Sequence, residues 1–434
     1  MNSSGMVAGA MGLLCEGGGY TAAQEDDLAI AAVVFAVTYL LIGLQRIPRL
    51  HLGRPAGALL GAVAMVLSGV LDFEAAKRAI DLDTILFLLG MMIMLAYLEL
   101  SGFFEILERR IMGYARSARM LLLLVMGSAA LLSALFMNDT ICLLFTPVVV
   151  RVTKRLALPP VPYLIGLAVA ANIGSACTIV GNPQNALIAV RSGIDLLPFA
   201  ARLWPISLLG LAAAAIILCA SFRREITTSR LAVPPPREPR APQRWMLLSS
   251  LAAGIGMIVA LAWGANPAAA AMSAAAVVVF AGAARPRTAL QHVDWSLLLL
   301  FGGLFVVMRG VEQAGLAHAV VRGIAGDLAD GEAFARLGVA VTVLSQAVSN
   351  VPAVMLFVPT LESLGQGADG LWLGLAAFST LAGNLTIIGS VANVIVFELA
   401  RREGVEVGFL DYLRIGFPVT ICTCLIAWAV LRTG

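Results

Sequence analysis

The stretch FMNDTICLLFTPVVV, residues 136–150, places Asn138 and Asp139 inside an otherwise apolar run. On insertion scales, a carboxylate at the centre of a membrane costs at least about 2.5–3.5 kcal/mol, and such a group usually faces a cavity and carries protons or ions. The acid indicates that this stretch is not a simple membrane-spanning helix. What it forms depends on the rest of the chain.

The composition is that of a membrane protein. Of the 434 residues, 60% are hydrophobic and 13% charged, and the mean hydropathy is +0.92, far above that of soluble domains. Several runs are long enough to cross roughly 30 Å of hydrocarbon as helices, and they lack the residue-by-residue alternation of a transmembrane barrel. We therefore predict an all-α polytopic membrane protein, with the lipid bilayer as a partner. The long apolar runs are 28–45, 83–101, 205–221, 245–264 and 412–431.

Other classes of function find no support in the sequence. The net charge of +3 comes from loop arginines and does not indicate nucleic acid as a partner. The six cysteines are scattered without metal-ligand spacing, so neither a disulfide framework nor a metal site is predicted. No phosphate-binding loop of the GxxxxGK[ST] kind occurs. We expect that the protein is not an enzyme and needs no cofactor.

The arginine and lysine clusters predict the topology, because basic loops face the cytoplasm. Placing the clusters inside requires residues 119–155 to enter from the cytoplasm and return to it, which makes the opening stretch the tip of a re-entrant hairpin. The acidic N-terminal segment 1–27 then lies outside and, lacking a basic start, is not a cleaved signal peptide. We expect a multi-pass protein of the bacterial inner membrane with its N-terminus outside.

The chain repeats itself on either side of a proline- and arginine-rich cytoplasmic linker, residues 223–244. Three blocks recur in the same order, at offsets of 213, 212 and 208 residues. The loop charges orient the two copies oppositely, so the repeats are inverted. Inverted repeats with interrupted helices are typical of secondary transporters, which bind substrate near the midplane. The paired blocks are 80–102 with 293–315, 138–147 with 350–359, and 178–185 with 386–393.

These repeats define the expected domains. The first repeat spans 28–222, with a hairpin at 119–155 and a broken helix at 160–190. The second spans 245–434, with a hairpin at 334–363 and a broken helix at 370–399.

Each predicted broken helix contains a glycine- and asparagine-rich interruption. The two are ANIGSACTIVGNPQN (171–185) and STLAGNLTIIGSVAN (379–393). Gly174 and Gly383 are among the residues expected to let the helices unwind. The backbone groups that unwinding frees must meet side chains, water or ligand, since lipid offers no hydrogen bonds. The polar side chains expected to form a substrate or ion site are Asn172, Thr178, Asn182, Asn185, Asn384, Thr386 and Asn393.

Asp139 stands apart from this set. Its counterpart in the second repeat is Val351, and the interrupted elements hold no lysine, arginine or histidine. A membrane carboxylate in such surroundings suits a group that alternately takes and releases a proton. Asp139 is therefore the candidate carrier of a proton, or a ligand for sodium, as the coupling ion.

Four blocks resemble the signatures of the ion transporter superfamily, and in particular its arsenite permease (ArsB) and sodium/proton antiporter (NhaD) branch. They are MNDTICLLFTPVV, ANIGSACTIVGNPQN, SNVPAVMLFVPTL and STLAGNLTIIGSVANVIVFE. The resemblance implies two oppositely entering hairpins whose tips meet the broken helices at the substrate site. The tips it implies here are Asn138, Asp139 and Thr140 in the first hairpin and Ser349, Asn350 and Val351 in the second.

The substrate is left open among three classes. The site residues suit a neutral metalloid hydroxide, so proton-coupled efflux of arsenite or antimonite is the first hypothesis. A sodium/proton antiporter is the second. A citrate- or dicarboxylate-type anion permease is the third, because a multiply charged anion would want arginine or several helix N-termini. A homodimer, and a soluble ATPase subunit docking on the basic linker, are partners that the sequence leaves open.

Overall fold

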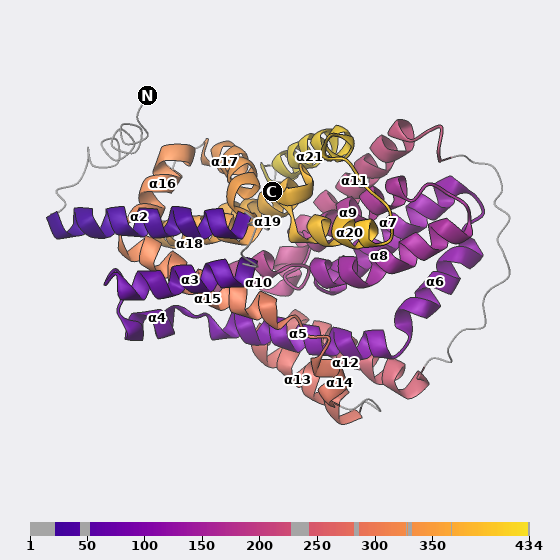
Figure 1. The fold of residues 1–434 in the computed structure, drawn as a ribbon, viewed down its shortest axis with the longest axis horizontal. Helices are drawn as coiled ribbons and strands as arrows, with labels where there is room; N and C mark the ends of the chain where they lie inside the picture. Colours follow the sequence, from indigo (N-terminus) through magenta and orange to yellow (C-terminus); the bar gives the residue numbers. More distant parts are fainter. Residues whose placement is uncertain are drawn as a thin grey trace. The chain divides into compact units, whose positions relative to one another are not determined.

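The computed structural model describes residues 22–43, 53–226, 243–281, 286–326, 328, 332–365 and 367–432. Most of the N-terminal segment 1–27 and of the linker 223–244 lies outside these residues. The described chain is helical, with no strand among its elements, which confirms the expected all-α fold (Figure 1).

The helices of the first half come in the order expected for one repeat. A short turn joins the hairpin helices α7 and α8, and an irregular segment separates α9 from α10. The helices are α2 (Ala22–Gly43), α3 (Arg54–Leu67), α4 (Phe73–Ala79), α5 (Leu82–Leu100), α6 (Phe103–Tyr114), α7 (Ala118–Leu135), α8 (Asn138–Arg155), α9 (Val161–Ser175), α10 (Pro183–Ser192) and α11 (Leu196–Ser221).

The helices of the second half follow the same order, each displaced by roughly 210 residues from its counterpart, and only the short 3₁₀ turn η1 is added. The two halves therefore repeat element by element. The helices are α12 (Arg244–Ala262), α13 (Pro267–Ala281), α14 (Pro286–Leu290), α15 (Trp295–Gln313), α16 (Leu316–Ala325), α17 (Ala333–Val348), α18 (Asn350–Leu364), α19 (Asp369–Ala382), η1 (Ile387–Gly389), α20 (Val391–Arg402) and α21 (Phe409–Arg432).

The repeats exchange helices. Gly90 of α5 packs so closely on α13 that a Cβ there would lie 2.6 Å from the carbonyl carbon of Ala271. Gly303 of α15 approaches Ala58 of α3 in the same way, at 2.7 Å. These four residues are equivalent in pairs, 213 positions apart. The long helix α5 of the first repeat thus packs on the short helix α13 of the second, and α15 of the second packs on α3 of the first. The chain consists of two intertwined inverted repeats.

The chain divides into two compact units, and neither follows the repeat boundary. The smaller unit contains α2, α3, α4, most of α15, α16 and the second part of α18. The larger contains the remaining helices, including both broken helices, both first hairpin helices and the start of α18. Every tip and break residue discussed below belongs to the larger unit.

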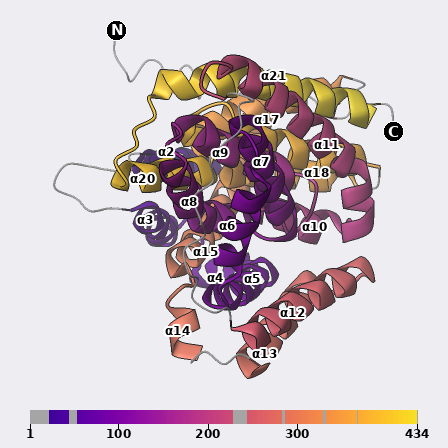
Figure 2. The ribbon, with the colours of Figure 1, turned by 90° about the vertical axis from the view of Figure 1, so that its right-hand side faces the viewer.

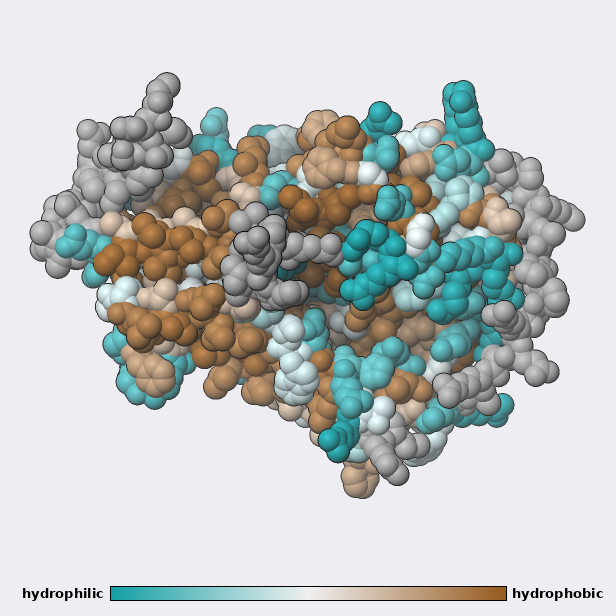
Figure 3. Space-filling view, in the orientation of Figure 1, coloured by the Kyte–Doolittle hydropathy of each residue, from teal (hydrophilic) through white to brown (hydrophobic). Residues whose placement is uncertain are grey.

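Six of the described helices are long and apolar enough to cross a membrane, α5, α7, α11, α12, α15 and α21. In the smaller unit, α2 and α3 expose a broad apolar surface (Figure 3), including Val33, Leu40 and Leu67. A surface of this kind suits lipid, since apolar side chains gain nothing from water. In the larger unit the final helices of the two repeats pack on each other, Gly210 of α11 against Thr423 of α21.

Candidate functional site

The first hairpin tip is fixed to the first broken helix by two hydrogen bonds. The chain turns at Phe136 and Met137 before α8 begins. The backbone N–H of Asn138 donates to the carbonyl oxygen of Gly181 at 2.9 Å. One turn earlier, the Thr178 hydroxyl donates to the carbonyl oxygen of Ala134 at 2.6 Å. The turn therefore lies directly against the break between α9 and α10, and Figures 1 and 2 show α8 and α9 side by side.

The first break satisfies its own backbone through asparagines. Asn182 caps α10, its Oδ1 accepting from the N–H of Asn185 at 2.9 Å. The Asn185 amide in turn donates to the carbonyl oxygens of Ser175, at 3.2 Å, and Thr178, at 3.0 Å. Ser175 is the last residue of α9 and Thr178 lies in the irregular segment, so neither carbonyl has a partner within a helix. The side chain of Asn185 thus supplies hydrogen bonds that the unwound backbone of the break would otherwise lack.

The second break repeats this arrangement. Asn393 donates to the carbonyl oxygens of Gly383, at 2.7 Å, and Thr386, at 3.0 Å. All three positions are 208 residues beyond those of the first break. Asn393 also donates to the hydroxyl of Tyr412, at 2.9 Å. The equivalence predicted from sequence blocks therefore extends to individual hydrogen bonds.

The clamp between hairpin and break is built differently in the second repeat. Thr386 donates to the side-chain oxygen of Gln346 at 2.9 Å, and the Gln346 amide donates to the carbonyl oxygen of Ala382 at 2.8 Å. Gln346 occupies the position of Ala134 in the first repeat. A side chain here replaces the direct contact with a backbone carbonyl.

Two glycines of the first break serve close packing. A Cβ at Gly174 would collide with the carbonyl oxygen of Ala130 on α7, and one at Gly181 with that of Ser175. Gly174 was expected to unwind the helix, but α9 continues through it to Ser175. Its small size lets α7 and α9 approach each other, and the unwound segment begins one residue after Ser175.

Asn172 joins the two repeats at the centre of the site. Its oxygen accepts from the Asn138 amide and from the Ser390 hydroxyl, both at 3.1 Å. Its nitrogen donates to the side-chain oxygens of Asn384, at 3.0 Å, and Asn393, at 3.1 Å. Two donors and two acceptors are the full capacity of an amide. Asn172 is wholly buried, and its polar atoms are all used within the protein.

Asp139 and Thr140 lie beside this network and are half-buried. The backbone N–H of Asp139 donates to the side-chain oxygen of Asn138 at 2.9 Å. Its carboxylate stands in the first turn of α8, where the positive end of a helix favours a negative charge. The acid of the opening stretch is therefore partly accessible at a helix start. No other Asp or Glu, and no Lys, Arg or His, occurs in the tips or breaks.

The second tip is conformationally strained. Ser349, which separates α17 from α18, has φ +73° and ψ 165°, a region that costs other residues than glycine of the order of 1–3 kcal/mol. Next to it, Asn350 is buried. With its amide nitrogen turned towards them, it donates to the carbonyl oxygens of Gly389 and Ser379, both at 3.1 Å. Tip and break are thus joined in this repeat too.

Two serines occupy equivalent places one turn before the tips. Ser133 and Ser345 are 212 positions apart and fully buried. Neither hydroxyl has a hydrogen-bond partner, and a buried polar group without one costs roughly 1–3 kcal/mol. The Asn185 oxygen and the Asn384 nitrogen are unsatisfied as well. These unsatisfied polar atoms could bind an ion or a small hydroxylated ligand.

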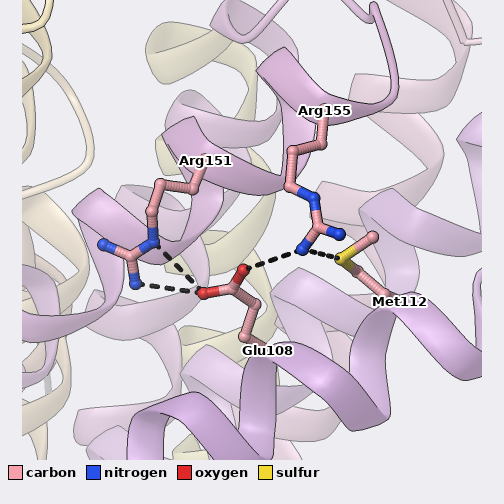
Figure 4. A network of polar contacts seen from close by, with 4 residues as sticks. All are labelled: Glu108, Met112, Arg151 and Arg155. Carbon is pink, nitrogen blue, oxygen red and sulfur yellow. Dashed lines mark hydrogen bonds and ion pairs between the residues drawn. The ribbon is translucent and has the colours of Figure 1, made fainter. Parts of the chain in front are cut away.

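The far end of α8 carries charges instead. Glu108 of α6 accepts from Arg151 at 3.1 Å and lies 3.7 Å from Arg155, which also contacts the sulfur of Met112 (Figure 4). Lys154 pairs with Glu403, just beyond α20, at 2.8 Å. The basic ends of α8 and α20 therefore lie at the same end of the larger unit. This is the end that the loop charges assign to the cytoplasm.

The structure thus joins Asn138, Asn384 and Asn393 to Asn172 through hydrogen bonds, and Asn350 to the backbone of the second break. Residues that the sequence did not single out join them: Gln346, Thr380, Ser390 and Tyr412. Tyr412 is buried and its helix comes close to the second break, since a Cβ at Gly416 would collide with Asn384. The contrast between Ala134 and Gln346 in the repeat alignment is the signal that could have identified Gln346.

A model of the CitMHS family, described as citrate transporter, matches residues 33–376. The chain belongs to the CitMHS family. CitMHS members and their relatives are membrane transporters, not enzymes. A rice (Oryza sativa) relative named silicon efflux transporter LSI3 is 30% identical, covering 92% of this chain and 96% of that one. A Dictyostelium discoideum protein with the provisional name transporter arsB is 24% identical over 91% and 90%.

The fold of this CitMHS chain also matches a solved structure. The crystal structure of the Alcanivorax borkumensis YdaH transporter, described as having an unusual topology, aligns with a TM-score of 0.57 at 15% identity. The alignment covers 95% of this chain and 98% of that one. The likeness supports the intertwined helical fold. The family match identifies this CitMHS protein as a secondary transporter.

Proposed function

We propose that this transporter exports a neutral hydroxylated metalloid acid, with arsenite or antimonite as first choice, in exchange for protons. The observation that carries the proposal is the chemistry of the tips and breaks. Their side chains are amides and hydroxyls with a single carboxylate, Asp139, and no basic residue. Amides and hydroxyls can hydrogen-bond the OH groups of a neutral acid without burying a net charge.

The relatives support this substrate class. The rice protein is named for silicon efflux, and silicic acid, like arsenious acid, is an uncharged hydroxide at neutral pH. The name of the Dictyostelium protein points in the same direction. The name of the rice protein favours a small neutral polyhydroxyl substrate and export as its direction.

Asp139 is the coupling group in this proposal. Its half-buried carboxylate stands at the tip next to Asn138, which contacts the central Asn172. Once the metalloid has left on the outer side, protonation there would neutralise the acid and allow the substrate-free site to return inward, and deprotonation inside would prepare it for the next metalloid. The proton gradient then supplies the driving force, and a soluble ATPase subunit is not required.

Everted membrane vesicles test the proposal. Vesicles containing the protein should accumulate arsenite when energised, and added arsenite should release part of an established pH gradient. Vesicles with Asp139→Asn should do neither, and vesicles without the protein set the background. Absence of arsenite movement, together with citrate uptake by intact cells, would replace the proposal with an anion permease, the activity for which the family is named.

A sodium/proton antiporter is the second candidate. The observation that favours it is the pair of buried, unpartnered hydroxyls of Ser133 and Ser345. Unpartnered buried hydroxyls before both tips could complete an oxygen-rich cation site with backbone carbonyls and Asp139. The same vesicles discriminate the two, because an antiporter releases the pH gradient on addition of sodium without arsenite.

A further inference from the structure

A pocket of about 310 Å³ lies in the larger unit, away from the tips and breaks. It forms where the starts of α11 and α19 meet the end of α21, three helices that contact one another (Figure 1). Its walls combine apolar side chains with one basic and one acidic residue. The lining residues are Ile194, Pro198, Ala201, Arg202, Asp369, Gly370, Leu373 and Leu431.

The two charged residues are unused by the protein. Arg202 and Asp369 line the same pocket and are exposed. Neither makes an ion pair or a side-chain hydrogen bond within the described part of the chain, so they do not pair with each other. Opposite charges that share a pocket without touching suit a ligand that carries both charges and bridges them.

The pocket lies at the membrane face opposite the basic loops. Helix α21 begins shortly after Arg402 and has 24 residues, about 36 Å at 1.5 Å per residue. That length crosses the hydrocarbon core. Leu431 is at its far end, so the pocket opens at the extracytoplasmic face, given that basic loops face inside.

Tryptophans near the pocket indicate that it lies at the depth of the lipid headgroups. Trp204, two residues after Arg202, is 53% exposed. Trp428 of α21 lies under the guanidinium of Arg432, 4.9 Å from it. Exposed tryptophans at one level of several helices are typical of the membrane–water interface. The pocket is therefore open to lipid headgroups as well as to water.

From these observations we infer that the pocket binds a zwitterionic headgroup that contains a phosphate and a primary ammonium, as in phosphatidylethanolamine of the outer leaflet. Arg202 would hold the phosphate through its planar fork of donors, and Asp369 would accept from the ammonium. Leu373 and Leu431 provide apolar surface for the glycerol end. Phosphatidylglycerol lacks the ammonium and leaves Asp369 facing a net negative lipid. Phosphatidylcholine has no N–H to donate.

Lipid titration of the purified full-length protein tests the inference, with binding followed by native mass spectrometry in detergent. Phosphatidylethanolamine should bind roughly tenfold more tightly than phosphatidylglycerol or phosphatidylcholine. Arg202→Gln and Asp369→Asn should each weaken that binding about three- to tenfold, the range for one hydrogen bond of ordinary net strength at an exposed site. Arg414→Gln and Asp411→Asn change the same two types of charge in an exposed pair at the end of α21 away from Leu431; they serve as matched controls and should leave the binding unchanged.

A third variant separates the pocket from its charges. Ala201→Phe fills the pocket at an exposed position and should weaken binding without altering any charge. Equal binding of the three lipids, or unchanged binding in all three pocket variants, would overturn the inference. Titration with soluble phosphoethanolamine shows whether the pocket recognises the lipid or the free headgroup. If it binds as tightly as the lipid, the site belongs to a free zwitterion and the lipid assignment is wrong.

Discussion

The amide nitrogen of Asn172 lies 3.1 Å from the side-chain oxygen of Asn393, so the break of one repeat is hydrogen-bonded directly to the break of the other. The same nitrogen also reaches Asn384, and the oxygen of Asn172 reaches Asn138. Three polar segments that are distant in sequence therefore share one side chain. The two breaks cannot separate unless Asn172 gives up its partners.

Removing that connection should destabilise the protein. Asn172→Ala leaves four partners unsatisfied, and hydrogen bonds between membrane helices contribute on average about 0.6 and at most about 1.7 kcal/mol each, so we expect a loss of about 2–4 kcal/mol. Asn172→Asp preserves the volume but removes both donors, and should also destabilise. Unfolding in detergent measures both, with Gln184→Met, which loses one 3.3 Å bond, as the control. Equal unfolding midpoints in all variants would contradict this role.

Asp139 should be essential for coupling and dispensable for folding. Asp139→Asn keeps the shape of a half-buried side chain but cannot release a proton. We expect loss of proton-coupled exchange in vesicles with an unchanged elution profile and unfolding midpoint. Asp411→Asn, which changes an exposed carboxylate in the first turn of α21, is the matched control and should retain coupling. Full exchange activity in Asp139→Asn would show that the proton travels elsewhere.

The packing of α7 on α9 predicts opposite effects at two glycines of the first hairpin region. Gly174→Ala forces a methyl group onto the backbone of Ala130 and should destabilise by about 1–3 kcal/mol, as overpacking usually does. Gly127→Ala, inside α7 with nothing within 4 Å of the new Cβ, should stabilise by about 0.5–1 kcal/mol because alanine is the better helix former. Thermal unfolding in detergent compares them. A stable Gly174→Ala variant would mean that the helices are less closely packed than described.

The strained backbone of Ser349 offers a way to separate conformation from chemistry. Ser349→Gly should relieve strain and raise stability by about 1 kcal/mol, whereas Ser349→Ala keeps the strain and removes only the hydroxyl. If the hydroxyl contacts substrate, both variants lose transport affinity although only one gains stability. A glycine variant no more stable than the alanine variant would argue against the strain.

The positions where the helices are interrupted could be predicted from the sequence. Asparagine, glycine and proline in apolar runs predicted both tips and both breaks, because such residues interrupt helices in lipid for a physical reason. The repeat offsets predicted which residues are equivalent, and Asn185 and Asn393 indeed make equivalent bonds.

The hydrogen-bond partners of these residues could not be predicted from the sequence. The repeat alignment sets Gln346 against Ala134 but does not show that its partners are Thr386 and the carbonyl of Ala382. The saturation of Asn172 depends on residues more than 200 positions away. The alignment also predicts that α5 and α15 are equivalent without indicating that each packs on a helix of the other repeat.

That exchange of helices constrains how the protein is made. Gly90 of α5 meets Ala271 only after about 180 further residues have been synthesised, roughly 10–35 s of translation at 5–20 residues per second. During that time the glycine face of α5 has no proper neighbour in the bilayer. The first half cannot mature on the ribosome as a finished module, and a truncated product should be degraded. Two halves expressed as separate polypeptides in one cell should instead complement each other.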